Sequence, residues 1–197
     1  MAFRRSDAPS QGGVASATPI PVKIVIAGGL GVGKTTFVGS ISEIPPLRTE
    51  AAMTSLSDGI DDLGPATTKT TTTVAMDFGR LTLGNDLILY LFGTPGQDRF
   101  QFMWEDLVKG AIGAIIMVDT SRLGDCFAAI DFMEQQGVPF VVAINAFNGE
   151  VGHRVEDVRE ALSLSAAVPI VITDARERSA TRTTLLELVQ HAIAQVT

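Results

Sequence analysis

The 197-residue chain has one cysteine, two histidines and 15 basic residues against 22 acidic ones. A lone cysteine cannot form an internal disulfide, and because Cys126 falls in an apolar segment we expect a buried, unreactive thiol in a reducing cytoplasm. The net charge of -7 argues against a nucleic-acid-binding surface, since such surfaces need clustered Lys and Arg. His153 and His191 show no pattern of a metal or nucleophilic site, so we assign them no chemistry.

Long hydrophobic runs are absent as well. The longest apolar stretches, near residues 111–118 and 138–144, fall far short of the roughly 20 residues that span a bilayer. The N-terminus is polar and lacks the hydrophobic stretch of a signal peptide. We therefore expect a cytoplasmic protein with no direct membrane insertion, in which any recruitment to a membrane would pass through partners.

Two regions of the chain differ in composition. Residues 1–20 are rich in Ser, Ala, Gly, Pro and Gln, which predicts a disordered N-terminal tail. Residues 21–197 are predicted to form a single domain, because the chain is of ordinary domain size and 46% apolar.

Within this domain, apolar runs typical of strands alternate with helical patterns. This alternation predicts an α/β fold with a six-stranded, mostly parallel sheet flanked by about five helices. Gly84-Asn85-Asp86 predicts a hairpin, and hence one antiparallel strand. The predicted strands are residues 22–27, 73–82, 87–93, 112–118, 138–144 and 168–172. The predicted helices are residues 34–42, 98–109, 122–136, 154–163 and 180–195.

The run Gly28-Gly-Leu-Gly-Val-Gly-Lys-Thr35 follows a strand pattern and opens a helical one, as the phosphate-binding loop GxxxxGK[ST] requires. Glycines allow successive backbone N–H groups to turn inward around a β-phosphate, Lys34 adds a positive charge near the β and γ oxygens, and Thr35 offers a hydroxyl to Mg²⁺. The alternative is a glycine turn that only joins a strand to a helix. The setting favours a nucleoside phosphate site.

About 30 residues, from Glu43 to Thr72, are full of Ser, Thr, Asp, Gly and Pro, and structureless loops of this length are usually functional or disordered. Thr73, the last of four consecutive threonines, has two interpretations: β propensity, or a hydroxyl that completes the Mg²⁺ shell. We expect the loop to be mobile without a triphosphate and to order on Thr73 when the γ-phosphate and Mg²⁺ are bound.

Three further motifs follow strand patterns, namely Gly93-Thr-Pro-Gly-Gln97, Asn145-Ala-Phe-Asn148 and Thr173-Asp-Ala-Arg176. With the phosphate loop and Thr73, in this order and spacing, they resemble the Ras-like small GTPases from about Val22 to the C-terminus. The Thr-Pro-Gly-Gln turn is similar to the bacterial MglA-type branch. The Thr-Val-Ala-Met-Asp-Phe run and the Asp-Ala-Arg ending are similar to the conservon (CvnD-type) GTPases of actinobacteria.

The resemblance implies a Ras-like P-loop G domain that binds GTP and GDP with Mg²⁺, hydrolyses GTP slowly and acts as a signalling switch. It also implies a Roadblock/LC7-type regulatory protein and a sensor-kinase-like membrane protein as partners. It assigns catalysis to Gln97, Lys34 and Thr73, and metal binding to Thr35 and Thr73. It assigns nucleotide contacts to Gly28, Leu30, Gly31, Val32, Gly33, Lys34, Thr35, Thr36, Gly96, Asn145, Asn148, Asp174, Ala175 and Arg176.

Four of these residues receive specific roles from the resemblance. Gln97 would orient the attacking water, although without the family resemblance it can be read as an ordinary turn glutamine. Gly96 would donate its N–H to the γ-phosphate. Asn145 would tie the base loop together, while the Ala175 N–H would meet the base carbonyl.

Two departures from the family pattern concern the phosphates. Gly93 stands where most Ras-like proteins have an aspartate that holds Mg²⁺ through water, so we expect one carboxylate fewer and weaker Mg²⁺ binding. Asp119 has two interpretations, a compensating carboxylate or a capping residue. Leu30 replaces a glycine close to where the glutamine and an incoming arginine must fit, which predicts slow hydrolysis. Arg48 and Arg99 are candidates for that arginine, unless they are solvated surface charges.

A third departure concerns the base. Asn148 replaces the aspartate of the usual NKxD motif, which accepts hydrogen bonds from guanine N1–H and the exocyclic amino group. Its NH₂ would face a donor, and an unpaired buried donor costs about 1 to 3 kcal/mol. Ala146 also removes the lysine stem that packs over the base. Guanine selectivity should therefore be weakened, unless Glu150 supplies a compensating carboxylate.

Three functions remain open. The leading hypothesis is a small GTPase that acts as a signalling switch. The second is a nucleotide-binding adaptor with little or no hydrolysis. The third is a P-loop kinase or ATPase, which the loose base motif favours. It is disfavoured because the sequence shows no basic lid segment and because the Gly-Gln turn has no role there.

Overall fold

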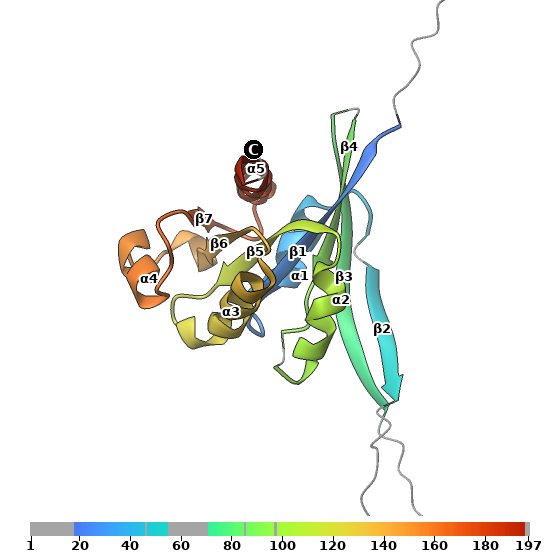
Figure 1. The fold of residues 1–197 in the computed structure, drawn as a ribbon, viewed down its shortest axis with the longest axis horizontal. Helices are drawn as coiled ribbons and strands as arrows, with labels where there is room; N and C mark the ends of the chain where they lie inside the picture. The colour runs from blue at the N-terminus through green and yellow to red at the C-terminus, as the bar shows by residue number, and fades with distance from the viewer. Residues whose placement is uncertain (1–17, 46, 55–70, 85, 97, 196–197) are drawn as a thin grey trace, which may run out of the picture.

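A seven-stranded sheet lies at the centre of the computed structural model, which describes residues 18–45, 47–54, 71–84, 86–96 and 98–195 (Figure 1). The strand order is β2-β3-β4-β1-β5-β6-β7. β2–β3 and β3–β4 are antiparallel, and every other neighbouring pair is parallel. The strands are β1 (Ile20–Gly28), β2 (Leu47–Thr54), β3 (Thr71–Leu83), β4 (Leu87–Gly93), β5 (Ala111–Val118), β6 (Phe140–Asn145) and β7 (Ile170–Thr173).

The α/β fold class is confirmed, and all six predicted strands are present. β2 is a correction, because residues 47–54 fall in the stretch predicted to be a loop and instead pair with β3 at the sheet edge. Its sequence, Leu-Arg-Thr-Glu-Ala-Ala-Met-Thr, has little β propensity of its own, so pairing rather than composition makes it a strand. Residues 55–70 lie outside the described residues, and the predicted ordering of this loop stays a prediction.

The β2–β3 pair extends beyond the rest of the sheet (Figure 1). Residues 77–83 of β3 pair with β4, whereas residues 71–76 pair only with β2. Near the N-terminus, β1 begins at Ile20, which is the last residue of the predicted tail. Residues 1–17 lie outside the described part of the chain.

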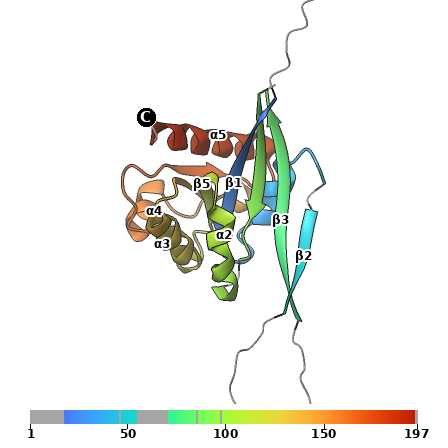
Figure 2. The ribbon, with the colours of Figure 1, turned by 45° about the vertical axis from the view of Figure 1, so that its right-hand side comes forward.

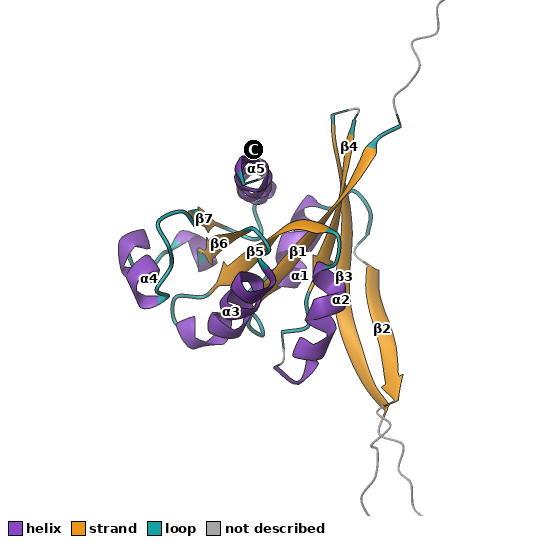
Figure 3. Ribbon diagram, in the orientation of Figure 1, coloured by secondary structure: helices purple, strands orange, loops and turns teal. Residues whose placement is uncertain are grey.

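Five α-helices of the described chain cover the sheet on its two faces (Figures 2 and 3). The helices predicted at 98–109 and 122–136 begin as the 3₁₀ turns Asp98–Met103 and Leu123–Cys126, which are common at helix N-termini. The other three start and end within a few residues of the predicted bounds. The α-helices are α1 (Lys34–Ile41), α2 (Trp104–Val108), α3 (Phe127–Gln136), α4 (Val155–Ala161) and α5 (Arg178–Ala194).

Alternate residues of the central strands enter two separate hydrophobic layers. Val25 and Ala27 of β1 pack in one layer with α2, α3 and α4, whereas Ile24 and Ile26 pack in the other with α1 and α5. This follows from the two-residue period of a strand that is covered on both faces. The central strands are therefore fixed by packing on both faces. In a sheet of this kind a ligand site is expected at the loops that follow the carboxyl ends of the strands.

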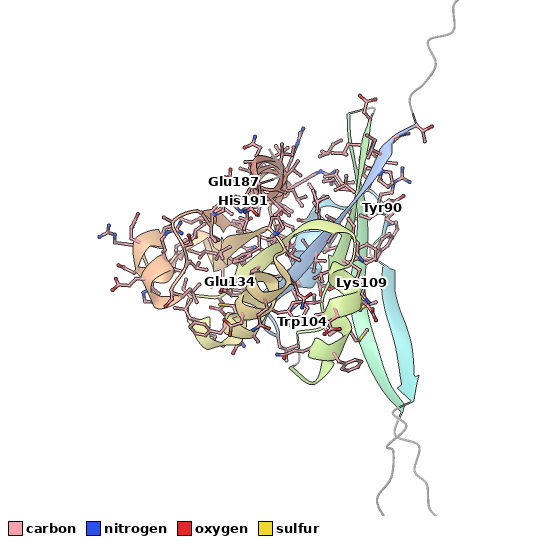
Figure 4. The ribbon with its side chains drawn as sticks, in the orientation of Figure 1. Tyr90, Trp104, Lys109, Glu134, Glu187 and His191 are labelled. Carbon is pink, nitrogen blue, oxygen red and sulfur yellow. The ribbon has the colours of Figure 1, made fainter. Side chains whose placement is uncertain are left out.

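Two residues in the first layer show how it is filled. Trp104 of α2, labelled in Figure 4, lies in this layer. Its ring meets that of Phe132 of α3 edge-on, with ring centroids 5.5 Å apart. Cys126 is buried beneath the start of α3, and this burial raises the pKa of its thiol to about 11. The prediction of a buried cysteine is confirmed, and a thiol with so high a pKa is a poor nucleophile at neutral pH.

Candidate functional site

The loop between β1 and α1 has the backbone that its glycine spacing predicts. Gly28, Gly31 and Gly33 have φ angles of 130°, 75° and 107°, in the left-handed region that side chains disfavour. A Cβ at Gly33 would lie 2.7 Å from the Asn145 amide nitrogen, so no larger residue fits there. The loop thus has no bulky side chains at these positions and leads into the N-terminus of α1. A helix N-terminus favours a bound anion because its backbone N–H groups point toward the ligand.

Lys34 folds back across this loop. Its Nζ donates hydrogen bonds to the carbonyl oxygens of Gly28, at 2.8 Å, and Gly29, at 2.6 Å, and the side chain is only 7% exposed. Burial lowers the pKa of the ammonium group to about 8, and the nearby carboxylate of Asp77 opposes that shift. A buried cation is therefore held inside the loop, where a phosphate would neutralise it.

Asp77 of β3 reaches the same place from the neighbouring side. The Thr35 hydroxyl donates to Asp77 Oδ2 over 2.6 Å. Asp77 lies opposite Gly93 in the β3–β4 ladder, and a Cβ at Gly93 would be 3.1 Å from Asp77 Cβ and 3.3 Å from its Oδ2. The expectation of one carboxylate fewer is therefore wrong, because Asp77 fills the space beside Gly93 with a carboxylate from the adjacent strand.

A cleft of about 410 Å³ opens over these groups, and we call it the phosphate-side cleft. Thr94 at its wall is 3% exposed, and its hydroxyl has no hydrogen-bond partner among the described residues. Gly96 lies close by, since a Cβ there would be 2.8 Å from Lys34 Nζ. The lining consists of Leu30, Gly31, Gly33, Lys34, Thr35, Thr36, Asp77, Thr94, Pro95 and Gly96.

Asn145, at the end of β6, joins three loops. Its Nδ2 donates to the Val32 carbonyl at 2.9 Å, and its Oδ1 accepts from the Ala175 N–H at 3.1 Å. The predicted role of Asn145 in tying the loops together matches this geometry. The Ala175 N–H, predicted to meet a base carbonyl, is instead donated to Asn145 in this structure.

A second cleft, of about 220 Å³, lies beside Asn145 and is called the base-side cleft below. It shares Gly31, Gly33 and Thr36 with the phosphate-side cleft, so one extended ligand can reach both. Glu150 does not line it but belongs to a neighbouring cleft, which corrects its suggested role. The lining consists of Gly31, Gly33, Thr36, Asn145, Phe147, Asp174, Ala175 and Arg176.

Asp174 and Arg176 form an ion pair at the wall of the base-side cleft. Asp174 Oδ2 lies 2.7 Å from Arg176 Nη2, and Oδ1 accepts from the Arg176 Nε and backbone N–H, each at 3.0 Å. These hydrogen bonds lower the pKa of Asp174 to about 2. The cleft therefore carries an ionised carboxylate at any physiological pH.

Arg122 is a neighbour of the phosphate loop that the sequence did not reveal. Its Nη2 donates to the Leu30 carbonyl at 3.0 Å, and its guanidinium also pairs with Asp119 and Asp125. Asp119 in turn accepts from the Ser121 N–H at 2.9 Å and hydroxyl at 2.6 Å. These contacts make Asp119 a turn-capping residue rather than a lining residue of the phosphate-side cleft.

Some predicted site residues cannot be placed. Gln97 lies outside the described residues, and the side chains of Thr73, Asn148, Arg48 and Arg99 do so as well. The backbone of Thr73 pairs with Ala52 of β2, four residues before Asp77. The roles assigned to these residues stay predictions.

Comparisons with known proteins agree with this geometry. A sequence model for a family described as "Conserved hypothetical ATP binding protein" matches residues 26–195. The uncharacterized protein MJ1339 of Methanocaldococcus jannaschii is 33% identical over 126 residues, which cover 63% of this chain and 69% of that protein. The Ras-related protein RABC2a of Arabidopsis thaliana is 30% identical over 103 residues, which cover 51% of this chain and 39% of that protein.

Similar folds occur among solved structures. The small GTPase Arl6 BBS3 of Trypanosoma brucei, solved with the nucleotide analogue GppNp, superposes with a TM-score of 0.64 at 18% identity, over 89% of this chain and 99% of that one. At this identity the likeness shows the P-loop G-domain fold alone. In the described part of the chain, no helix is long and apolar enough to cross a bilayer.

Proposed function

The chain belongs to the family described as conserved hypothetical ATP binding proteins, and we propose that it is a Ras-like small GTP-binding protein that acts as a nucleotide-dependent switch. One observation carries this proposal. The phosphate-side and base-side clefts meet at Gly31, Gly33 and Thr36, so the phosphate loop continues directly into a pocket bounded by the two loops after β6 and β7. A nucleotide can bind along this path, with its phosphates at Lys34 and its base at Asn145.

The residues at the phosphate end fit Mg²⁺. Within the described chain no three or more His, Cys, Asp or Glu side chains form a metal cage, so an ion here would rely on phosphates and water. Mg²⁺ is held in this way, through one or two carboxylates and a hydroxyl beside the substrate phosphates. Thr35 and Asp77 would hold it. When bound, the ion would neutralise charge that develops on the phosphate oxygens.

Slow hydrolysis is part of the proposal. Leu30 is 59% exposed at the mouth of the phosphate-side cleft, and a Cβ at Gly96 would be 2.9 Å from its Cα. Any arginine that enters from a partner therefore has to pass a bulky side chain beside the glutamine turn. Gln97 would still orient the attacking water, as the resemblance implies.

The test of nucleotide binding is a titration of the purified chain with GTP, GDP, ATP and XTP, with and without Mg²⁺. We expect GTP and GDP to bind more tightly than ATP, and more tightly with Mg²⁺ than without it. A chain that binds none of the four would refute the proposal.

The test of hydrolysis is single-turnover cleavage of bound GTP by the wild type and by Gln97→Ala. A slow rate that the substitution abolishes supports the switch. A chain that binds GTP and cleaves none of it would instead favour the adaptor function.

For partners we propose a Roadblock/LC7-type regulator and, through it, a sensor-kinase-like membrane protein, by family resemblance alone. A candidate regulator immobilised on a column should retain the chain loaded with a GTP analogue and release the GDP form. Equal retention of both forms would argue against a switch.

A further inference from the structure

Guanine presents two adjacent hydrogen-bond donors, N1–H and the exocyclic NH₂, and a carboxylate can accept from both with its two oxygens. Asn148 has a single acceptor oxygen and cannot do the same. A guanine-binding site in this chain therefore needs a carboxylate from another position near the base-side cleft.

Asp174 supplies the only carboxylate among the described residues that line this cleft. Glu150 lines the neighbouring cleft instead, and Asp119 is committed to Ser121 and Arg122. The topology explains the position of Asp174. β6 and β7 are parallel, with Asn145 opposite Thr173, so the loops 145–148 and 173–176 leave the sheet side by side. A carboxylate can reach the space between them from either loop.

We propose that Asp174 is the residue that reads the base, and that the base is guanine. The carboxylate has in effect moved from the loop after β6 to the loop after β7, which leaves Asn148 in the position of the usual aspartate. This inference rests on the proposed function and specifies its ligand. Adenine would turn the N1 lone pair toward the carboxylate and xanthine would turn its O2 toward it, so both should bind less well than guanine.

Arg176 orients this carboxylate in the structure. Three hydrogen bonds from Arg176 occupy both oxygens of Asp174, and they keep it ionised. The Arg176 side chain is 53% exposed, whereas Asp174 is 18% exposed. Because the guanidinium side of this ion pair is about half exposed, water screens the pair and its contribution to stability is modest. In the proposed complex, guanine N–H groups replace the guanidinium at the carboxylate oxygens. The backbone N–H of Arg176 would continue to hold Oδ1.

The experiment compares the affinities of the full chain for GDP, XDP and ADP in Mg²⁺ by titration calorimetry. Asp174→Asn replaces a carboxylate oxygen by an NH₂ of the same size. We expect it to weaken GDP binding about 10-fold to 100-fold and to strengthen XDP binding, because the new donor can pair with xanthine O2. Glu150→Gln, which removes a carboxylate from the neighbouring cleft, is the matched control and should change neither affinity.

A second variant distinguishes a change in base preference from a general loss of folding. Asn148→Asp combined with Asp174→Asn returns the carboxylate to the first loop, and it should restore the preference for GDP over XDP. An Asp174→Asn variant that weakens GDP and XDP by the same factor would overturn the inference, because a structural role has no base preference. Equal binding of all three nucleotides by the wild type would overturn it as well, while leaving nucleotide binding intact. Binding of none would refute the proposed function itself.

Discussion

Asp77→Asn is the sharpest test of the phosphate end of the site. The substitution keeps the shape of the side chain and its position opposite Gly93, and it removes the negative charge that lies 2.6 Å from the Thr35 hydroxyl. If Asp77 holds Mg²⁺, the variant should lose the extra GDP affinity that the metal provides. A hydrogen bond to a charged group contributes about 1.5 to 3 kcal/mol, which corresponds to about 10-fold to 100-fold in affinity.

The assay measures the dissociation constant of GDP in Mg²⁺ and again in a chelator. The wild type should bind far more tightly with the metal. In Mg²⁺ the variant should bind GDP more weakly than the wild type, so that its affinity changes little when the metal is removed. In chelator it should bind GDP as well as the wild type or better. The reason for the second result is that a carboxylate beside phosphate oxygens repels them when no cation lies between. Asp131→Asn, an exposed carboxylate on α3, serves as the control.

Two outcomes would refute this reasoning. An equal loss of affinity with and without Mg²⁺ would mean that Asp77 supports the loop rather than the metal. The exchange variant Asp77→Gly/Gly93→Asp should recover the gain in GDP affinity that Mg²⁺ provides. If it does not, Asp77 supports the loop rather than the metal. That variant moves the carboxylate to the other strand and avoids the 3.1 Å contact that a Cβ at Gly93 makes with Asp77.

Three further predictions concern Lys34, Asn145 and Cys126. Burial lowers the pKa of Lys34 to about 8, so GDP affinity should fall as the pH rises from 7 to 9 and the side chain loses its positive charge. Lys34→Arg should abolish that fall, and a wild-type affinity that does not change with pH would contradict the prediction. Asn145→Ala removes two buried hydrogen bonds and leaves the Ala175 N–H unpaired, so urea denaturation should show that the free energy of unfolding falls by about 2 to 4 kcal/mol. A fall of under about 1 kcal/mol would mean that Asn145 does not hold the loops together. Cys126 should react with a thiol reagent at pH 7.5 only when the chain is unfolded, and rapid labelling of the native protein would show that the start of α3 opens.

Much of the fold could be predicted because its signals are local. The two-residue and 3.6-residue apolar periods located six strands and five helices, since each period arises within one element. The phosphate loop was equally readable, because Gly28, Gly31 and Gly33 need left-handed backbone angles that few other residues adopt. β2 escaped because an edge strand of mixed composition is formed by pairing with β3 rather than by its own propensity.

The sequence by itself determined that this chain has a phosphate loop, a G-domain order of motifs and an asparagine where a base-reading aspartate is usual. The tertiary structure added where two carboxylates lie relative to the positions that lack the usual ones. Asp77 lies beside Gly93 because of the register of two antiparallel strands, and Asp174 lies in the base-side cleft because two parallel strands end side by side. The first of these was latent in the predicted hairpin at residues 84–86, whose register pairs Leu83 with Leu87 and so Asp77 with Gly93. Asp174 was already among the nucleotide contacts that the family resemblance implies. That it is the carboxylate lining the base-side cleft follows from the sheet order, which no local pattern records.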